Sequence, residues 1–227
     1  MDLETRYQDV CNRIQNLCIA AGNIPVPRLI AVIKKHPVEK IIALAALGQV
    51  WFGENYCDEM QKKATDIKTT TAQVKWSFIG QLQSNKIARI VEITDEIQSG
   101  CSEKHFRYIN RYVLEMNKNN FPVFILVNAG NEEQKSGCLG AEVQDLVQFI
   151  QRDCPALELQ GVMAIPPANF IDEAFTTPPE IYLKLRDLAD HTGLKKLSLG
   201  MTQDLKLAIT TRTDVVRIGT QIFGERS

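Results

Sequence analysis

The stretch from Arg28 to Gly48 reads RLIAVIKKHPVEKIIALAALG. Its first part, from Arg28 to Lys34, is dense in branched aliphatic residues, which is typical of a strand buried on both faces. Pro37 stands where the first turn of a helix tolerates proline, and apolar residues then recur at helical spacing until Gly48. The stretch therefore predicts a buried strand that leads directly into an amphipathic helix.

The same unit of a strand followed by a helix recurs along the rest of the chain. We expect further strands at residues 49–53, 75–80, 95–99, 122–128, 157–165, 195–199 and 214–218. Helices are expected between them, at 37–48, 57–68, 84–93, 102–119, 140–152, 179–191 and 202–210. Such alternation is typical of parallel strands. With the first strand this makes about eight, the number that closes a (β/α)8 barrel.

The rival architecture is an open, doubly wound sheet, which favours a glycine-rich fingerprint after its first strand. This chain has Lys34-Lys35-His36-Pro37 at that place. An extra N-terminal helix is expected before the barrel, because Val10, Ile14, Leu17, Cys18 and Ala21 recur at helical spacing. No linker rich in Gly or Ser divides the sequence. We therefore expect an α/β fold, one TIM-type barrel domain over residues 1–227.

The composition argues against several classes of partner. The 227 residues carry 26 basic and 27 acidic side chains, so we expect no nucleic acid and no membrane partner. The first residues are polar and acidic, unlike a signal peptide, and no stretch approaches the roughly 18 apolar residues of a membrane span. The six cysteines show no Cys-x-x-Cys pair and no zinc-ligand spacing. We expect a cytoplasmic monomer with reduced thiols and no metal.

Polar residues follow the predicted strands, where a parallel barrel carries its reactive groups. Lys34 ends an apolar strand, so its amine is expected in a low-dielectric mouth that favours the neutral form and a Schiff base with an aldehyde. The alternative is that Lys34 only begins a solvated loop with Lys35 and His36. His36, His105 and His191 show no spacing suited to a metal or a relay, and we expect all three at the surface.

The last two strand ends predict a site for a phosphate group. Residues 198–202, Ser-Leu-Gly-Met-Thr, lead into a predicted helix whose free amide groups and positive dipole end favour an anion. Residues 217–220, Arg-Ile-Gly-Thr, add a second glycine-backed turn and a hydroxyl. Glycine and threonine are also ordinary turn and capping residues. Arg217 could instead form an ion pair at the barrel rim, with Glu54 or Glu225.

Seven motifs, in order along the chain, are shared with one known family. They are Ala31-Val32-Ile33-Lys34, Phe52-Gly53-Glu54-Asn55-Tyr56, Phe78-Ile79-Gly80-Gln81-Leu82-Gln83-Ser84-Asn85-Lys86, Lys135-Ser136-Gly137, Gly161-Val162-Met163-Ala164-Ile165-Pro166, Leu197-Ser198-Leu199-Gly200-Met201-Thr202 and Val216-Arg217-Ile218-Gly219-Thr220-Gln221-Ile222-Phe223-Gly224. Through them the chain resembles the pyridoxal phosphate homeostasis proteins, over residues 29–226. It departs from the family pattern at Ile33, where a serine is usual, and at Ser77, where a histidine is frequent.

Members of that family are single-domain barrels similar to the N-terminal domain of bacterial alanine racemase, and they hold pyridoxal 5'-phosphate as an aldimine on the first-strand lysine. The resemblance therefore implies Lys34 as the covalent site, with Asn55 beside it and Arg217 at the pyridine nitrogen. It implies phosphate contacts at Ser198, Gly219 and Thr220 and at the main chain near Met201. A permanent cation at the ring nitrogen disfavours ring protonation and weakens the cofactor as an electron sink.

The function that the resemblance implies is to bind, buffer or deliver pyridoxal phosphate to apoenzymes, without robust turnover. The alternative is a low-activity amino-acid racemase, with Lys34 as one base and Tyr56 or Cys57 as a second acid. Racemases that share the arginine carry a second base on another domain, and we expect none beyond Ser227. A third hypothesis is a phosphate-binding barrel without any covalent bond. The loop at 166–179, with a proline pair at each end, could be a lid or a stiff surface loop.

Overall fold

The strands of the chain close into a parallel barrel. The computed structural model describes residues 1–132 and 134–224, so residues 225–227 of the expected domain, and with them Glu225, lie outside the described residues. Each strand pairs in parallel with the next one along the chain, and β8 pairs with β1. The predicted (β/α)8 barrel is confirmed, and the open doubly wound sheet is excluded because the sheet has no edge strand.

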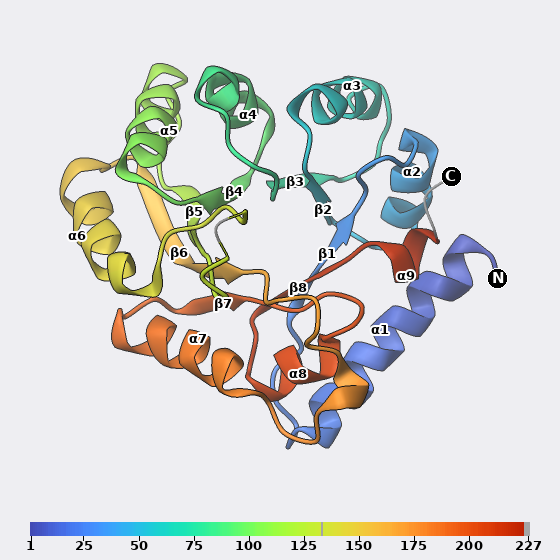
Figure 1. Cartoon of the computed structure of the whole chain (residues 1–227). Helices are drawn as coiled ribbons and strands as arrows, with labels where there is room; N and C mark the ends of the chain where they lie inside the picture. The colour runs from blue at the N-terminus through green and yellow to red at the C-terminus, as the bar shows by residue number, and fades with distance from the viewer. Residues whose placement is uncertain (133, 225–227) are drawn as a thin grey trace.

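The elements lie close to their predicted positions (Figure 1). The strands are β1 (Arg28–Val32), β2 (Trp51–Glu54), β3 (Lys75–Phe78), β4 (Glu96–Gly100), β5 (Phe121–Val127), β6 (Leu157–Ala164), β7 (Lys196–Ser198) and β8 (Val215–Ile218). The helices around them are α1 (Leu3–Ala20), α2 (Val38–Ala46), α3 (Cys57–Ile67), α4 (Ile87–Ile93), α5 (Glu103–Glu115), α6 (Val143–Asp153), α7 (Glu180–His191), α8 (Leu205–Thr210) and α9 (Thr220–Phe223). Short 3-10 turns precede α4, α6 and α7, and α9 is an element that the sequence pattern did not predict.

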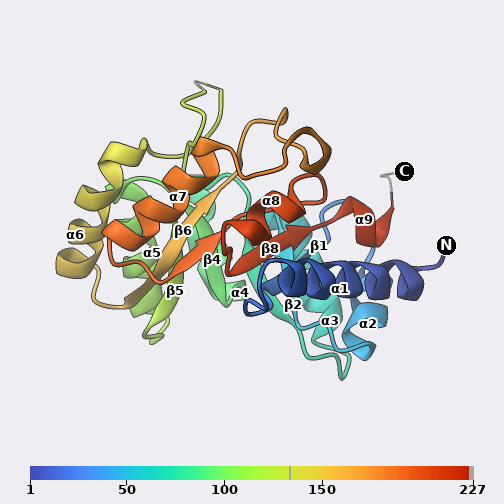
Figure 2. The same cartoon turned by 90° about the horizontal axis from the view of Figure 1, so that it is seen from below.

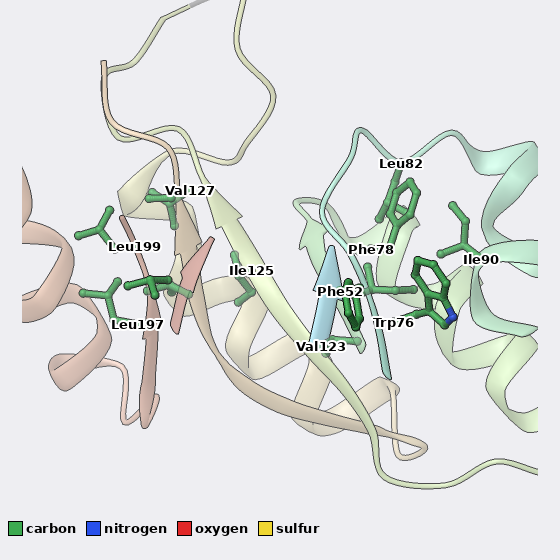
Figure 3. Close-up of a cluster of buried hydrophobic side chains, with 14 of the residues drawn as sticks. Phe52, Trp76, Phe78, Leu82, Ile90, Val123, Ile125, Val127, Leu197 and Leu199 are labelled. Atoms are coloured by element: carbon green, nitrogen blue, oxygen red, sulfur yellow. The ribbon is translucent and has the colours of Figure 1, made fainter. Parts of the chain in front are cut away.

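Two apolar layers hold the barrel together. The larger layer lies between the strands and the surrounding helices, where side chains such as Phe78, Leu82 and Ile90 lie together (Figure 3). A smaller cluster, formed by Ile30, Phe124, Leu126, Met163 and Val215, fills part of the barrel interior. Because side chains alternate along a strand, β1, β5, β6 and β8 supply both layers. This explains why the strands read as nearly continuous apolar runs.

The extra N-terminal helix lies across the seam between the last and the first strand-helix units (Figure 2). The Asp2 side chain caps α1 by accepting a hydrogen bond from the Thr5 main-chain N–H at 2.8 Å. Val10, Ile14 and Cys18 form its buried face, and the helix packs against α2, α8 and α9. In the described residues, no helix has both the length and the apolar character that crossing a membrane requires.

Candidate functional site

A cavity of about 390 Å³ opens at the C-terminal ends of the strands. Its apolar lining comes from Val32, Ile79, Ile165 and Met201, and its polar lining from Lys34, His36, Asn55, Thr202, Gln203, Arg217, Gly219 and Thr220. The structure thus brings together every predicted site residue except Ser198. These residues are far apart in the sequence and meet because all parallel strands present their C-terminal ends at one rim.

Lys34 lies just beyond the end of β1, and both Lys34 and Val32 line the cavity. Ile33, between them, is fully buried and belongs to the apolar layer under the helices. The departure from the family pattern at Ile33 therefore falls in the core and not on the cavity. Lys35 is exposed, as predicted for the solvated neighbour.

An ion-pair cluster, formed by the buried Glu54 and Lys63 and the partly buried Glu59, supports the main chain on both sides of Lys34. The Nζ of Lys63 donates to the main-chain oxygen of Ile33 at 2.8 Å, to Glu54 at 2.8 Å and to Glu59 at 2.6 Å. Glu59 in turn accepts from the Lys35 N–H at 2.6 Å. The residues before and after Lys34 are thus tied to the same three side chains. Sequence reasoning did not single out Lys63, because only the fold brings it to β1.

The same cluster positions Asn55. One Glu54 oxygen accepts from the main-chain N–H groups of Asn55 and Tyr56, at 2.7 and 3.2 Å. Burial raises the pKa of Glu54, and the hydrogen bond from Lys63 opposes that shift. Glu54 is therefore committed to the Lys63 ion pair and is not the partner of Arg217.

Asn55 lines the cavity, and its Oδ1 is buried and has no hydrogen-bond partner in the described part of the chain. A Cβ at Gly80 would overlap the main chain of Asn55, so only glycine lets the loop after β3 approach so closely. A ligand in the cavity can supply the missing hydrogen bond of Asn55.

Arg217, on β8, is a buried cation that lines the cavity. Its guanidinium donates to Ser198 Oγ at 2.6 Å and to the main-chain oxygen of Ala164 at 2.8 Å. Burial lowers the pKa of Arg217 to about 10, which leaves it protonated at neutral pH. Within residues 1–132 and 134–224 it forms no ion pair, so the rim ion pair with Glu54 is not formed.

Ser198 does not line the cavity. It is fully buried, and its hydroxyl donates to Gln98 Oε1 at 2.7 Å while it accepts from Arg217. A hydroxyl has one proton, so this side chain has none left for a phosphate oxygen. The predicted phosphate contact at Ser198 is therefore not supported by the geometry, which places this side chain beside Arg217 in the barrel interior.

The predicted anion site at the helix after β7 is also corrected. That helix, α8, begins at Leu205 instead of residue 202. Its first amide groups already have a carboxylate partner, because the two oxygens of Asp172 accept from the N–H groups of Lys206 and Leu207 at 2.9 and 3.0 Å. Asp172 lies in the loop after β6, and so this intramolecular anion takes the place that the sequence assigned to a ligand.

The loop after β8 keeps its predicted place at the cavity. Gly219 and Thr220 line it, at the start of the four-residue helix α9. A Cβ at Gly219 would lie 3.2 Å from the main-chain oxygen of Val32, which shows how closely this turn approaches β1. Thr202, which ends the stretch 198–202 predicted to hold an anion, and Gln203, which the sequence pattern did not single out, complete this wall of the cavity. The sequence feature that could have identified them as cavity residues is their position, two to three residues after Gly200.

Asp172, in the middle of the loop at 166–179, fastens this loop to its surroundings. The Asp172 N–H donates to the main-chain oxygen of Gln203 at 2.8 Å, and its carboxylate accepts from Arg13 of α1 at 2.9 Å. The middle of the loop is thus held by α1, by α8 and by the loop after β7. These contacts favour the stiff surface loop over the lid.

His36 was expected at the surface, and this prediction is wrong. Its side chain is buried and lines the cavity, and its ring stacks on Phe223 with centroids 5.1 Å apart. The Nδ1 of His36 lies 3.4 Å from the Lys40 Nζ. His105 is partly buried, with Nδ1 3.6 Å from the Cys101 sulfur, and only His191 is exposed as expected. Burial of His36 depends on α9, which the sequence pattern did not reveal.

The model of the family described as "Alanine racemase, N-terminal domain" matches residues 9–227. The chain is 34% identical over 232 residues to the pyridoxal phosphate homeostasis protein of Haemophilus influenzae, which covers 100% of this chain and 97% of that protein. It is 36% identical over 205 residues to the protein of the same name from Schizosaccharomyces pombe, with 87% and 84% covered. The chain belongs to the pyridoxal phosphate homeostasis protein family.

Solved structures agree with membership in the pyridoxal phosphate homeostasis family. PipY from Synechococcus elongatus, solved without and with PLP bound, matches with TM-scores of 0.85 and 0.84 at 26% identity, over 98% of this chain and 100% of that chain. Alanine racemase from Clostridium difficile matches with a TM-score of 0.72 at 14% identity, and the match covers 98% of this chain but 56% of the racemase. The likeness to the racemase shows a shared barrel fold and no more.

The cavity residues fit the cofactor that the PipY structure contains. A lysine amine, a buried guanidinium and an asparagine oxygen face one cavity, and within the described residues the guanidinium has no carboxylate partner and the asparagine oxygen no hydrogen-bond partner. A glycine turn whose Cβ position is crowded by β1 closes its far wall. An amine suits an aldehyde, a guanidinium suits a ring nitrogen or an anion, and the turn offers main-chain N–H groups.

Proposed function

We propose that this chain binds pyridoxal 5'-phosphate as a Schiff base on Lys34 and buffers or delivers it to apoenzymes. In this proposal it acts in the cytoplasm as one domain and as a monomer. The observation that carries it is that Lys34 and the buried Arg217 line the same cavity. Membership in the homeostasis family supports the choice of ligand.

Each cavity residue has a separate task in this proposal. Lys34 supplies the nucleophilic amine, and Arg217 donates a hydrogen bond to the ring nitrogen. The phosphate group lies against the main chain of Gly219, the main chain near Met201 and the hydroxyl of Thr220. Asn55 Oδ1 accepts a hydrogen bond from the ligand, which satisfies its open acceptor.

The bound cofactor would supply an aldehyde and an electron-accepting ring, but Arg217 limits the second property. Arg217 stays protonated at neutral pH, so it donates to the ring nitrogen and disfavours a proton there. A ring without that proton stabilises a carbanion poorly. The arrangement therefore suits storage of the cofactor better than catalysis with it.

The racemase alternative lacks its predicted second acid. Tyr56 is half exposed, and Cys57 is buried at the start of α3 with its thiol pKa raised by burial. Neither side chain is among those that line the cavity in the described chain. A second acid or base must reach the substrate carbon to complete racemisation, so binding and delivery is the function that the geometry favours.

The decisive experiment is the visible absorbance of the protein with pyridoxal phosphate, before and after borohydride. We compare wild type with Lys34→Ala, and use Lys35→Ala as a matched control because Lys35 is the exposed neighbour. The wild type and Lys35→Ala should show a Schiff-base band, and reduction should fix the cofactor on the peptide that contains Lys34. Lys34→Ala should show neither.

Absence of a band after added pyridoxal phosphate would refute the proposal and leave a phosphate-binding barrel without a covalent bond. Fixation on Lys35 would refute the assignment to Lys34. Sustained interconversion of D- and L-amino acids, above the rate with Lys34→Ala, would instead establish the racemase. Transfer to a pyridoxal-phosphate-dependent apoenzyme, measured as recovered activity of that enzyme, tests delivery.

A further inference from the structure

A continuous line of hydrogen bonds crosses the barrel interior beneath Arg217. We name it the interior chain, and it consists of Arg28, Glu96, Gln98, Ser198 and Arg217. The Arg28 Nη2 donates to both Glu96 carboxylate oxygens, at 2.7 and 2.9 Å, and Gln98 Nε2 donates to Glu96 at 2.7 Å. Ser198 donates to Gln98 at 2.7 Å, and Arg217 donates to Ser198 at 2.6 Å.

The interior chain runs from one mouth of the barrel to the other. Arg28 begins β1 and its side chain is 27% exposed, whereas Gln98 and Ser198 are completely buried. Glu96 and Gln98 are two residues apart on β4, so both project from the same face of that strand. Barrel interiors are usually filled by branched apolar side chains. Here the interior chain brings in polar side chains from four strands, and each of these side chains makes at least one hydrogen bond, although the Arg28 Nε has no partner in the described residues.

The direction of every bond in the interior chain is fixed by its two ends. The Glu96 carboxylate accepts from Arg28 and from Gln98, so Gln98 presents its NH2 group to Glu96 and its oxygen to Ser198. Ser198 must then donate to Gln98 and can only accept from Arg217. Arg217, which has donors alone, completes the sequence. Reversal of any one bond would place a buried donor against a donor or a buried acceptor against an acceptor.

The charges along the interior chain are unequal. Arg28 and Glu96 neutralise each other at the N-terminal mouth, whereas the Arg217 guanidinium donates to neutral oxygens, those of Ser198 and Ala164, and forms no ion pair with a described residue. Two of its five N–H donors are used in this way. The guanidinium is thus held in place on one side by neutral acceptors, and it keeps its charge for whatever occupies the cavity.

We infer that Gln98, anchored by Glu96, is a positioning residue that acts through Ser198 to aim the Arg217 guanidinium at the cofactor's ring nitrogen. This inference rests on the proposed function and assigns Ser198 to Arg217 instead of to the phosphate group. Without Gln98, the Ser198 hydroxyl turns freely and Arg217 loses its fixed acceptor. The affinity that depends on the ring nitrogen then falls.

The test measures how tightly two ligands bind to the wild type and to a small set of variants. The ligands are pyridoxal 5'-phosphate and an analogue in which a C–H group replaces the ring nitrogen. The variants are Gln98→Met, which keeps volume but removes both hydrogen bonds, Ser198→Ala, and the double variant. Ser99→Ala is the matched control, because Ser99 is a buried serine on the same strand whose Oγ has no partner in the described chain.

Dissociation constants are measured by absorbance titration, and apoprotein stability by thermal unfolding. We expect Gln98→Met and Ser198→Ala each to weaken binding of pyridoxal phosphate about tenfold, with little change for the analogue. The double variant should bind pyridoxal phosphate no more weakly than whichever single variant binds it more weakly, because Gln98 and Ser198 act on Arg217 through the same line of hydrogen bonds. Ser99→Ala should bind both ligands as wild type does.

Equal losses for the two ligands would overturn the inference, because a general packing defect does not distinguish them. Unchanged binding of pyridoxal phosphate in Ser198→Ala would overturn it as well, even if Gln98→Met failed to fold. A wild-type protein that binds no pyridoxal phosphate would instead remove the proposed function itself. The two failures are therefore distinguishable.

Discussion

At the scale of single residues, burial decides the chemistry around the cavity. Asp204, just after the loop that lines it, accepts from the Met201 N–H and from the Tyr182 hydroxyl, each at 2.7 Å. Burial nevertheless raises the pKa of Asp204, so these hydrogen bonds do not fully replace water around the charged form. The loop with Met201 is thus held by a carboxyl group whose charge is costly.

The raised pKa of Asp204 predicts a dependence of stability on pH. The folded state binds the Asp204 proton more tightly than the unfolded state does. The protonated carboxyl therefore contributes to the free energy of unfolding, fully below the pKa of the unfolded state, and this contribution is lost as pH rises through the pKa of the folded state. As pH rises above the ordinary aspartate pKa of about 4, the apoprotein should lose stability relative to Asp204→Asn, which keeps the acceptor without the charge. Denaturant unfolding at several pH values measures the difference, and a difference that stays constant with pH contradicts the prediction.

At the scale of elements, α3 supports the ends of two neighbouring strands. Lys63 reaches from this helix to the main chain beside Lys34, and it pairs with the Glu54 carboxylate that holds Asn55. The cavity lining after β1 and after β2 therefore shares one support. A substitution in α3 should therefore alter ligand binding in the cavity, although no residue of α3 lines it.

Lys63→Met should destabilise the protein by about 3–5 kcal/mol, because it leaves the buried Glu54 without its cation. It should also weaken binding of pyridoxal phosphate, since both loops lose their common anchor. Denaturant unfolding and absorbance titration check the two effects. Lys62→Met, an exposed neighbour on the same helix, is the control and should leave both unchanged. A loss below about 1 kcal/mol in Lys63→Met would show that the cluster is not a support.

At the scale of the whole molecule, α1 lies where the first and the last strand–helix units of the barrel meet and contacts both. Arg13 donates to the Thr202 main-chain oxygen at 3.2 Å, to Gln221 at 3.1 Å and to Asp172 at 2.9 Å. These partners belong to the segments after β7, β8 and β6. One side chain outside the barrel therefore links three successive segments at the cavity side of the fold.

Arg13→Met should weaken binding of pyridoxal phosphate about fivefold, a loss of about 1 kcal/mol, although Arg13 does not line the cavity. The physical reason is that the segments after β6, β7 and β8 would move independently. Titration of the variant beside Arg111→Met measures the effect, because Arg111 is an exposed arginine of α5 whose ion pair is also at the surface. Equal affinities for the two variants would refute the role of α1.

The sequence by itself determined that the chain forms a barrel and that the functional side chains lie at the C-terminal ends of its strands. It also placed Lys34 and Arg217 at the same site. These follow from local patterns: buried strands alternate with amphipathic helices, and parallel strands present their C-terminal ends together. The extra N-terminal helix was equally visible in its apolar spacing. Such features need no knowledge of which distant side chains meet.

Only the tertiary structure decided where Ser198 points, which anion caps α8 and that His36 is buried. Ser198 meets Gln98 from 100 residues away, and Arg13 meets Asp172 from 159 residues away. His36 is covered by Phe223 of the short helix α9. A hydrogen bond has a direction that depends on both partners, and burial depends on every element that packs nearby, so neither can be read from the spacing of residues along one segment.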